Sequence, residues 1–126
     1  MKATSKFRER GGTPGYLPPE IWANEDKFST KWDIFSLGAI FYELLSTRNP
    51  FKYNKNSVDE IIDANARAEI NFKDLALMAI SPLAIHLLKR MLTLSPDIRI
   101  SADEALSHPW LQIYDEELPK PIKASS

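Results

Sequence analysis

The stretch from Ser29 to Thr47 constrains the fold of this chain more than any other. Between Ile34 and Leu45 only three side chains are polar, and nearly all the rest are large and apolar. On a helix with 3.6 residues per turn these apolar positions surround almost the whole circumference, which is typical of a helix buried inside a soluble domain. The stretch is too short for a membrane span and is interrupted by Asp33 and Glu43. We therefore expect a buried central helix.

Capping signals divide the rest of the chain into further helices. Thr30 and Asp33 fit a capping box at the start of the central helix, and Ser57-x-x-Glu60 and Ser101-x-x-Glu104 repeat that pattern. Ser81-Pro82 is a cap followed by proline at the first helical position. The expected segments are a helical turn over 19–23, the central helix, and helices over 58–68, 82–92 and 101–108. The apolar residues Val58, Ile61 and Ile62 lie on one side of the second of these helices, and the next is expected to turn inward Leu83, Leu87, Leu88, Met91 and Leu92. No strand pattern is convincing, so the expected fold class is mainly α, with about five helices around one buried central helix.

Composition excludes several classes of protein. A chain of 126 residues is one domain's worth, and its formal net charge of −1 gives no basic field for nucleic acid or for a membrane surface. The absence of cysteine excludes disulfides, thiolate zinc sites and cysteine nucleophiles. No apolar run follows Met1, so we expect no signal peptide and a cytoplasmic location.

Metal and hydrolase chemistry finds little support. His86 and His108 are far apart in sequence, without a His-Glu-x-x-His pattern, so we expect no metal site. No Gly-x-Ser-x-Gly occurs, and the serines fall at helix caps. The tail from 112 to 126 lacks the basic amphipathic helix of a calmodulin target.

Residues 12–20 form the most distinctive loop of the chain. Two glycines and three prolines in nine residues fix several backbone angles, so we expect a shaped loop rather than a linker.

Six short motifs, in order, carry a family resemblance. They are GTPGYLPPE (12–20), DIFSLG (33–38), NPF (49–51), LLKRML (87–92), PDIRISA (96–102) and HPWL (108–111). Together they resemble the C-terminal lobe of a eukaryotic serine/threonine protein kinase domain, most like the calcium/calmodulin-dependent and calcium-dependent group. The resemblance covers residues 5–111. It implies an activation-segment remnant over 1–11, expected to be flexible, a partial kinase domain over 12–111 and a tail over 112–126.

The resemblance also implies site residues. It assigns substrate binding to Thr13, Gly15, Leu17 and Glu43, the last pairing with an arginine upstream of the phosphoacceptor. From the residues alone, the alternative for Thr13 is an ordinary turn threonine. Charge patterning alone supports a solvated glutamate near a helix end equally well for Glu43. Pro18 stands where the family usually has alanine.

Three further roles follow from the same resemblance. Glu20 and Arg99 are implied to form a buried ion pair, against the alternative of two unrelated surface charges. Asp33 is implied to anchor the catalytic loop, a role compatible with helix capping. Glu9 occupies about the place of an activating phosphorylated residue and would partly replace phosphate with a carboxylate.

Phosphoryl transfer needs elements that this sequence does not contain. There is no glycine-rich G-x-G-x-x-G loop, no His-Arg-Asp and no Asp-Phe-Gly. We therefore expect no catalytic residue, no bound metal and no cofactor on this segment, although an intact family member uses ATP and magnesium. On its own the chain should be inactive.

The resemblance implies a partial serine/threonine kinase domain, a segment that in an intact family member presents protein substrates and braces the catalytic loop. Its expected partners are protein substrates or the missing kinase half. A non-catalytic interaction module and a truncated product without folded function are the alternatives. Because the helix that covers one side of the central helix would lie upstream, we expect an exposed apolar patch around Ile34, Phe41 and Leu45.

Overall fold

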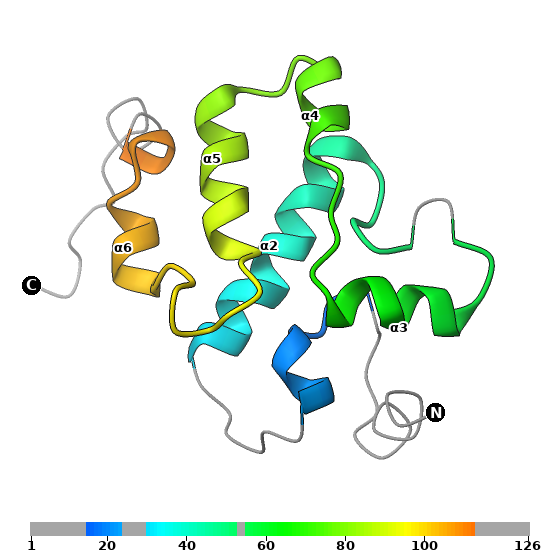
Figure 1. Cartoon of the computed structure of the whole chain (residues 1–126). Helices are drawn as coiled ribbons and strands as arrows, with labels where there is room; N and C mark the ends of the chain where they lie inside the picture. Colours follow the sequence, from blue (N-terminus) through cyan, green and yellow to red (C-terminus); the bar gives the residue numbers. More distant parts are fainter. Residues whose placement is uncertain (1–14, 24–29, 53–54, 113–126) are drawn as a thin grey trace, which may run out of the picture.

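The computed structural model describes residues 15–23, 30–52 and 55–112, which form helices joined by turns and contain no strand (Figure 1). The elements are η1, a 3-10 helix (Pro19–Ala23), α2 (Thr30–Ser46), α3 (Val58–Ala66), α4 (Lys73–Leu77), α5 (Pro82–Met91) and α6 (Ala102–Leu106). Residues 109–112 add a last helical turn. The mainly α fold class predicted from the sequence is confirmed. Among these residues no helix has the length and apolarity that crossing a membrane requires.

Helix α2 lies in the middle of this arrangement, with α5 packed along it and α6 beside its first half (Figure 1). Phe35 and Ala39 are completely buried, and Tyr42 is nearly so. Gly38 allows α2 and α5 to approach closely, because a Cβ at this position would lie 2.9 Å from the Cβ of Met91. The predicted central helix is therefore confirmed.

Two apolar clusters hold the helices together. The larger joins α2 to the other helices around its C-terminal half and contains Phe35, Ala39, Tyr42, Phe51, Ala64, Leu75, Ile85, Leu88 and Leu92. The smaller joins α2, α5 and α6 and contains Ile34, Leu87, Met91, Ile100 and Ala105. Both clusters pack on α2, so this helix positions everything else.

One face of α2 is not covered. Leu37, Ile40 and Leu44 are 43%, 42% and 72% exposed, and their spacing of three and four residues places them on one line along the helix. The predicted patch around Ile34, Phe41 and Leu45 is therefore wrong, since Ile34 is buried and the other two are only partly exposed, packed at the edges of the clusters. We call Leu37, Ile40 and Leu44 the α2 stripe.

The capping hydrogen bonds predicted at the helix starts are present to different degrees. Ser101 and Glu104 form a complete capping box on α6. Ser57 caps α3, but the Glu60 side chain accepts from the backbone N–H of Asn56 instead of that of Ser57. Ser81 precedes α5 without a capping hydrogen bond, so the proline that follows it is the only helix-start signal in this pair.

Two side chains of the predicted apolar helix faces are exposed. Val58 is 51% exposed because it is the first residue of α3, a full turn before the buried Ile62. Leu83 is 37% exposed because the buried face of α5 runs through Ala84 and Leu88 instead. Helix α3 ends at Ala66, two residues earlier than predicted.

Candidate functional site

The loop from Gly15 to Pro18 is held in place by side chains of other segments, which donate hydrogen bonds to its backbone carbonyls. Asn49 Nδ2 donates to the Gly15 oxygen (3.1 Å), Ser36 Oγ to the Tyr16 oxygen (2.6 Å) and Asn65 Nδ2 to the Leu17 oxygen (2.6 Å). The three donors come from three separate segments, namely the turn after α2, α2 itself and α3. Because each of these hydrogen bonds fixes one peptide unit, the loop is a rigid element and not a loose connection.

Asn49 connects this loop to the turn after α2. Its side-chain oxygen accepts from the N–H groups of Phe51 (2.9 Å) and Lys52 (3.1 Å), while its nitrogen donates to Gly15. A Cβ on Gly15 would lie 2.6 Å from Asn49 Nδ2. Only glycine leaves room for the buried Asn49 side chain, which explains the residue type at position 15.

Asn65 provides the corresponding link to α3. It is completely buried, donates to Leu17 and accepts from the indole N–H of Trp22 at 2.5 Å. One amide side chain therefore joins the loop, η1 and α3, and α3 lies beside η1 in Figure 1.

Tyr16 brings Glu43 to the same loop. The Tyr16 hydroxyl donates to Glu43 Oε1 at 2.6 Å, and Lys52 Nζ lies 5.4 Å from the centre of the Tyr16 ring. The hydrogen bond to Glu43, followed by burial, raises the pKa of the Tyr16 phenol. Among the described residues, Glu43 Oε2 accepts no hydrogen bond, so this carboxylate retains capacity for a second donor.

Glu20 and Arg99 form a buried, bidentate ion pair, with both N–O distances at 2.8 Å and side-chain exposures of 6% and 0%. The remaining guanidinium donors bond to the backbone oxygens of Thr93, Lys31 and Leu94. All five N–H groups of Arg99 are thereby used, and its guanidinium lies 4.9 Å from the centre of the Phe35 ring. The pair anchors η1, which follows the loop, to the start of α2 and to the turn after α5.

Asp33 is exposed in the first turn of α2 and is not brought into contact with the loop. It accepts no hydrogen bond within the described part of the chain. One turn later along the same face comes Leu37, so Asp33 heads the α2 stripe. Thr13 and Glu9, along with the predicted segment 1–11, lie outside the described residues.

The two histidines lie together, although the sequence separates them. His86 Nδ1 and His108 Nε2 are 2.8 Å apart, and the rings stack with centroids 5.0 Å apart. His108 Nδ1 accepts from the Trp110 N–H, so His108 Nε2 carries the proton and donates to His86. That arrangement leaves no lone pair on His108 for a metal, and the described residues contain no group of three candidate ligands.

Sequence reasoning missed the side chains that hold the loop. Ser36, Asn49 and Asn65 were not predicted as site residues, and Tyr16 was noted only as part of a motif. Asn65 carried a usable signal, because it follows Ile61 and Ile62 by one helical turn on the buried side of α3. Ser36 and Asn49 carried none, since their partners are 20 and 34 residues away.

Comparisons with known proteins agree on one family. Residues 1–111 match the family described as "Protein kinase domain". Serine/threonine-protein kinase PEPKR2 of Arabidopsis thaliana is 38% identical over 105 residues, covering 83% of this chain and 22% of that protein. Calcium-dependent protein kinase 33 of the same plant is 37% identical over 119 residues, covering 94% of this chain and 22% of its own length.

Solved structures show the same likeness. A structure of titin kinase and its flanking domains superposes with a TM-score of 0.73 at 35% identity, covering 88% of this chain and 20% of that chain. The chain thus spans about a fifth of the length of the curated relatives named above.

Proposed function

Because this chain belongs to the protein kinase domain family, we propose that it is the substrate-docking and bracing part of a serine/threonine kinase domain. The activity to which it contributes is ATP-dependent phosphorylation of proteins. The loop of residues 15–18 receives the substrate segment beside the phosphoacceptor, and the helices behind it keep that loop in place.

One observation carries this proposal, the rigid loop with a carboxylate beside it. Three buried or half-buried side chains fix the carbonyls of Gly15, Tyr16 and Leu17. Tyr16 orients Glu43 through one oxygen and leaves the other to accept from a cation. A fixed carboxylate at the edge of such a loop suits an arginine of the substrate, which donates in pairs.

The α2 stripe supports the presence of a covering partner. Leu37, Ile40 and Leu44 form an exposed apolar line on an otherwise buried helix, with Asp33 at its start. Monomeric proteins seldom leave such a line uncovered. The remainder of a kinase domain is the partner we propose for it, with Asp33 accepting hydrogen bonds from the catalytic loop.

Protein kinases use ATP and magnesium. The residues of this chain do not fit these groups, since the sequence supplies neither a glycine-rich phosphate loop nor the Asp-Phe-Gly that binds magnesium. We therefore assign no step of phosphoryl transfer to this chain, and a nucleotide site would be formed by other residues.

The test begins with an antibody against residues 81–111, used to isolate the native polypeptide from its source cells. A polypeptide much larger than the 14.4 kDa of this chain should phosphorylate peptides in the presence of ATP and magnesium. Glu43→Gln should then raise KM for a peptide with arginine upstream of the phosphoacceptor, by roughly tenfold for a lost charge-assisted hydrogen bond, and leave kcat unchanged.

A matched control separates recognition from stability. Asp97→Asn makes the same carboxylate-to-amide change at an exposed position and should change neither parameter. The same assay compares this peptide with one in which alanine replaces the upstream arginine. If the two peptides have equal KM values with the original enzyme and with the Glu43→Gln variant, the proposed role of Glu43 is contradicted. A native polypeptide of 14.4 kDa without phosphotransferase activity would instead favour the interaction module, with the α2 stripe as its binding surface.

A further inference from the structure

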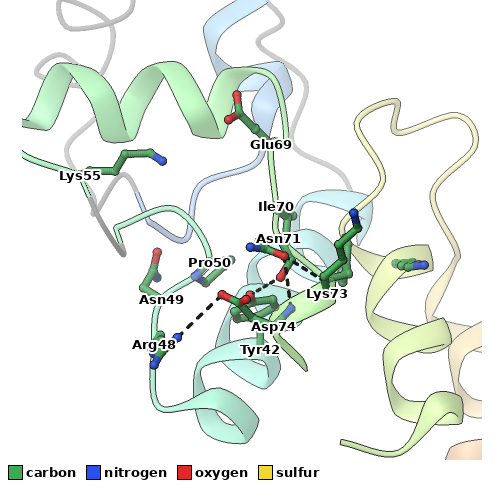
Figure 2. Close-up of a pocket in the computed structure, with 12 residues that line it drawn as sticks. Tyr42, Arg48, Asn49, Pro50, Lys55, Glu69, Ile70, Asn71, Lys73 and Asp74 are labelled. Atoms are coloured by element: carbon green, nitrogen blue, oxygen red, sulfur yellow. Dashed lines mark hydrogen bonds and ion pairs between the residues drawn. The ribbon is translucent and has the colours of Figure 1, made fainter. Parts of the chain in front are cut away.

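A pocket of about 640 Å³ lies between the C-terminal end of α2 and the segment that leads from α3 into α4 (Figure 2). Its lining includes the rings of Tyr42, Pro50 and Phe72. Its charged lining residues are Arg48, Lys55, Glu69, Lys73, Asp74 and Lys89. None of these charged side chains belongs to the substrate-docking loop described above.

The carboxylates of the pocket already form ion pairs, whereas three of its lysines do not. Glu69 pairs with Arg67 at 2.9 Å, and Asp74 lies 3.8 Å from Arg48. Lys55, Lys73 and Lys89 form no ion pair within the described part of the chain. The lining therefore carries four cations and two carboxylates, an excess of positive charge on a chain whose net charge is −1.

The three lysines are spread around the pocket rather than gathered at one point. Lys55 precedes α3, Lys73 begins α4 and Lys89 belongs to α5. Figure 2 shows Lys55 and Lys73 at opposite sides of the space. Lys89 Nζ lies 5.6 Å from the centre of the Phe72 ring, which keeps one cation beside an aromatic residue of the lining. Several separated anionic groups match this arrangement better than a single phosphate.

The backbone at the edge of the pocket also has unused hydrogen-bonding groups. Residues 69–72 connect α3 to α4 outside any helix or strand. In the described structure, the N–H and C=O of Ile70 make no hydrogen bond, whereas the Asn71 carbonyl accepts from Tyr42 and Phe72 already has helical backbone angles. An unpaired backbone edge beside a pocket is the feature to which an extended peptide adds as a strand.

We propose that this pocket binds an extended acidic peptide segment of a partner protein. Carboxylates of the peptide meet Lys55, Lys73 and Lys89, and its backbone pairs with Ile70. Asn49 lines the pocket and also holds the Gly15 carbonyl, so the bound peptide lies next to the turn that supports the substrate-docking loop. The site goes beyond the proposed function and does not depend on it.

Fluorescence polarisation with the full chain tests this proposal. The probe is a labelled peptide of about eight residues, roughly 26 Å long when extended, in which glutamate alternates with valine. Lys55→Ala, Lys73→Ala and Lys89→Ala together should weaken binding about tenfold, because each exposed ion pair contributes a factor of about two. Raising the salt concentration from about 50 to about 300 mM should weaken it further. Arg90→Ala, an exposed cation outside the pocket on the same helix as Lys89, should leave binding unchanged.

Two modified peptides separate the charge from the backbone contribution. Replacing glutamate by glutamine should abolish most of the binding, and methylating alternate backbone nitrogens of the peptide should weaken it although its charge is retained. Equal binding by the triple lysine variant and the original chain would overturn the proposal. Complete displacement of the peptide by inorganic phosphate, added at the same total concentration of negative charge, would also overturn the proposal. That result would indicate a site for a small anion.

Discussion

Replacing Arg99 by alanine removes five hydrogen-bond donors from the interior and leaves the buried Glu20 carboxylate without its partner. Loss of one member of a buried ion pair typically costs ~3–5 kcal/mol, because the remaining charge stays out of water. A domain of ordinary stability has ~5–15 kcal/mol in total. At about 4 °C or more per kcal/mol, Tm should fall by more than about 10 °C. Thermal unfolding followed by circular dichroism measures this directly.

Arg67→Ala is the matched control for this prediction. Arg67 also forms two ion pairs, with Asp63 and Glu69 at 2.9 Å each, but its side chain is 62% exposed. Exposed pairs contribute about 1 kcal/mol or less, so its Tm should change by only a few degrees. Burial, and not the number of ion pairs, is the reason for the difference. Equal Tm changes for Arg99→Ala and Arg67→Ala would refute that reasoning.

Three further changes probe other parts of the fold. Gly15→Ala should cost about 1–3 kcal/mol in a urea titration, since its Cβ would lie 2.6 Å from Asn49 Nδ2, and adding Asn49→Ala should make the loss less than additive. An exposed apolar line such as the α2 stripe favours association between copies of the chain, so Leu44→Glu should lower the apparent mass in light scattering. It should leave stability within about 0.5 kcal/mol, because Leu44 is 72% exposed. Burial and the neighbouring His86 lower the pKa of His108 below its usual 6.5, so the unfolded chain binds this proton more readily than the folded one. Stability should therefore fall as pH drops below about 6.5, and His108→Gln should flatten Tm between about pH 7.5 and 5.5.

Local signals predicted the parts of the fold that depend on local physics. The central helix follows from a long apolar stretch, and the start of α6 follows from the Ser101–Glu104 capping box, which the structure contains in full. The turn over 19–23 is present at the predicted residues. The identity of the exposed face of α2 was not predictable, because apolar residues surround that helix and provide no contrast between faces. The neighbours of α2, and not its own sequence, decide that Leu37 is exposed and Ile34 is buried.

The candidate site depended on contacts that no local pattern contains. The pairing of Glu20 with Arg99 was expected from the family resemblance alone. Asn65 donates a hydrogen bond to the Leu17 carbonyl, which is 48 residues away in the sequence, and the two contacting histidines are 22 residues apart. Polar partners at such separations become visible only when the helices are in place, so the loop was predictable as a shaped segment while the side chains that shape it were not.

The Glu20–Arg99 pair also dictates an order of events during synthesis. Its two members are 79 residues apart, so the carboxylate beside the N-terminal loop leaves the ribosome long before its partner has been made. Contacts at this separation close late and slowly. A chain whose synthesis stops before residue 99 keeps the side chains that hold the loop of residues 15–18 but leaves the Glu20 carboxylate of η1 without its partner. A segment that is incompletely anchored in this way is a target for proteases and chaperones. The buried pair can therefore form only after translation has passed residue 99.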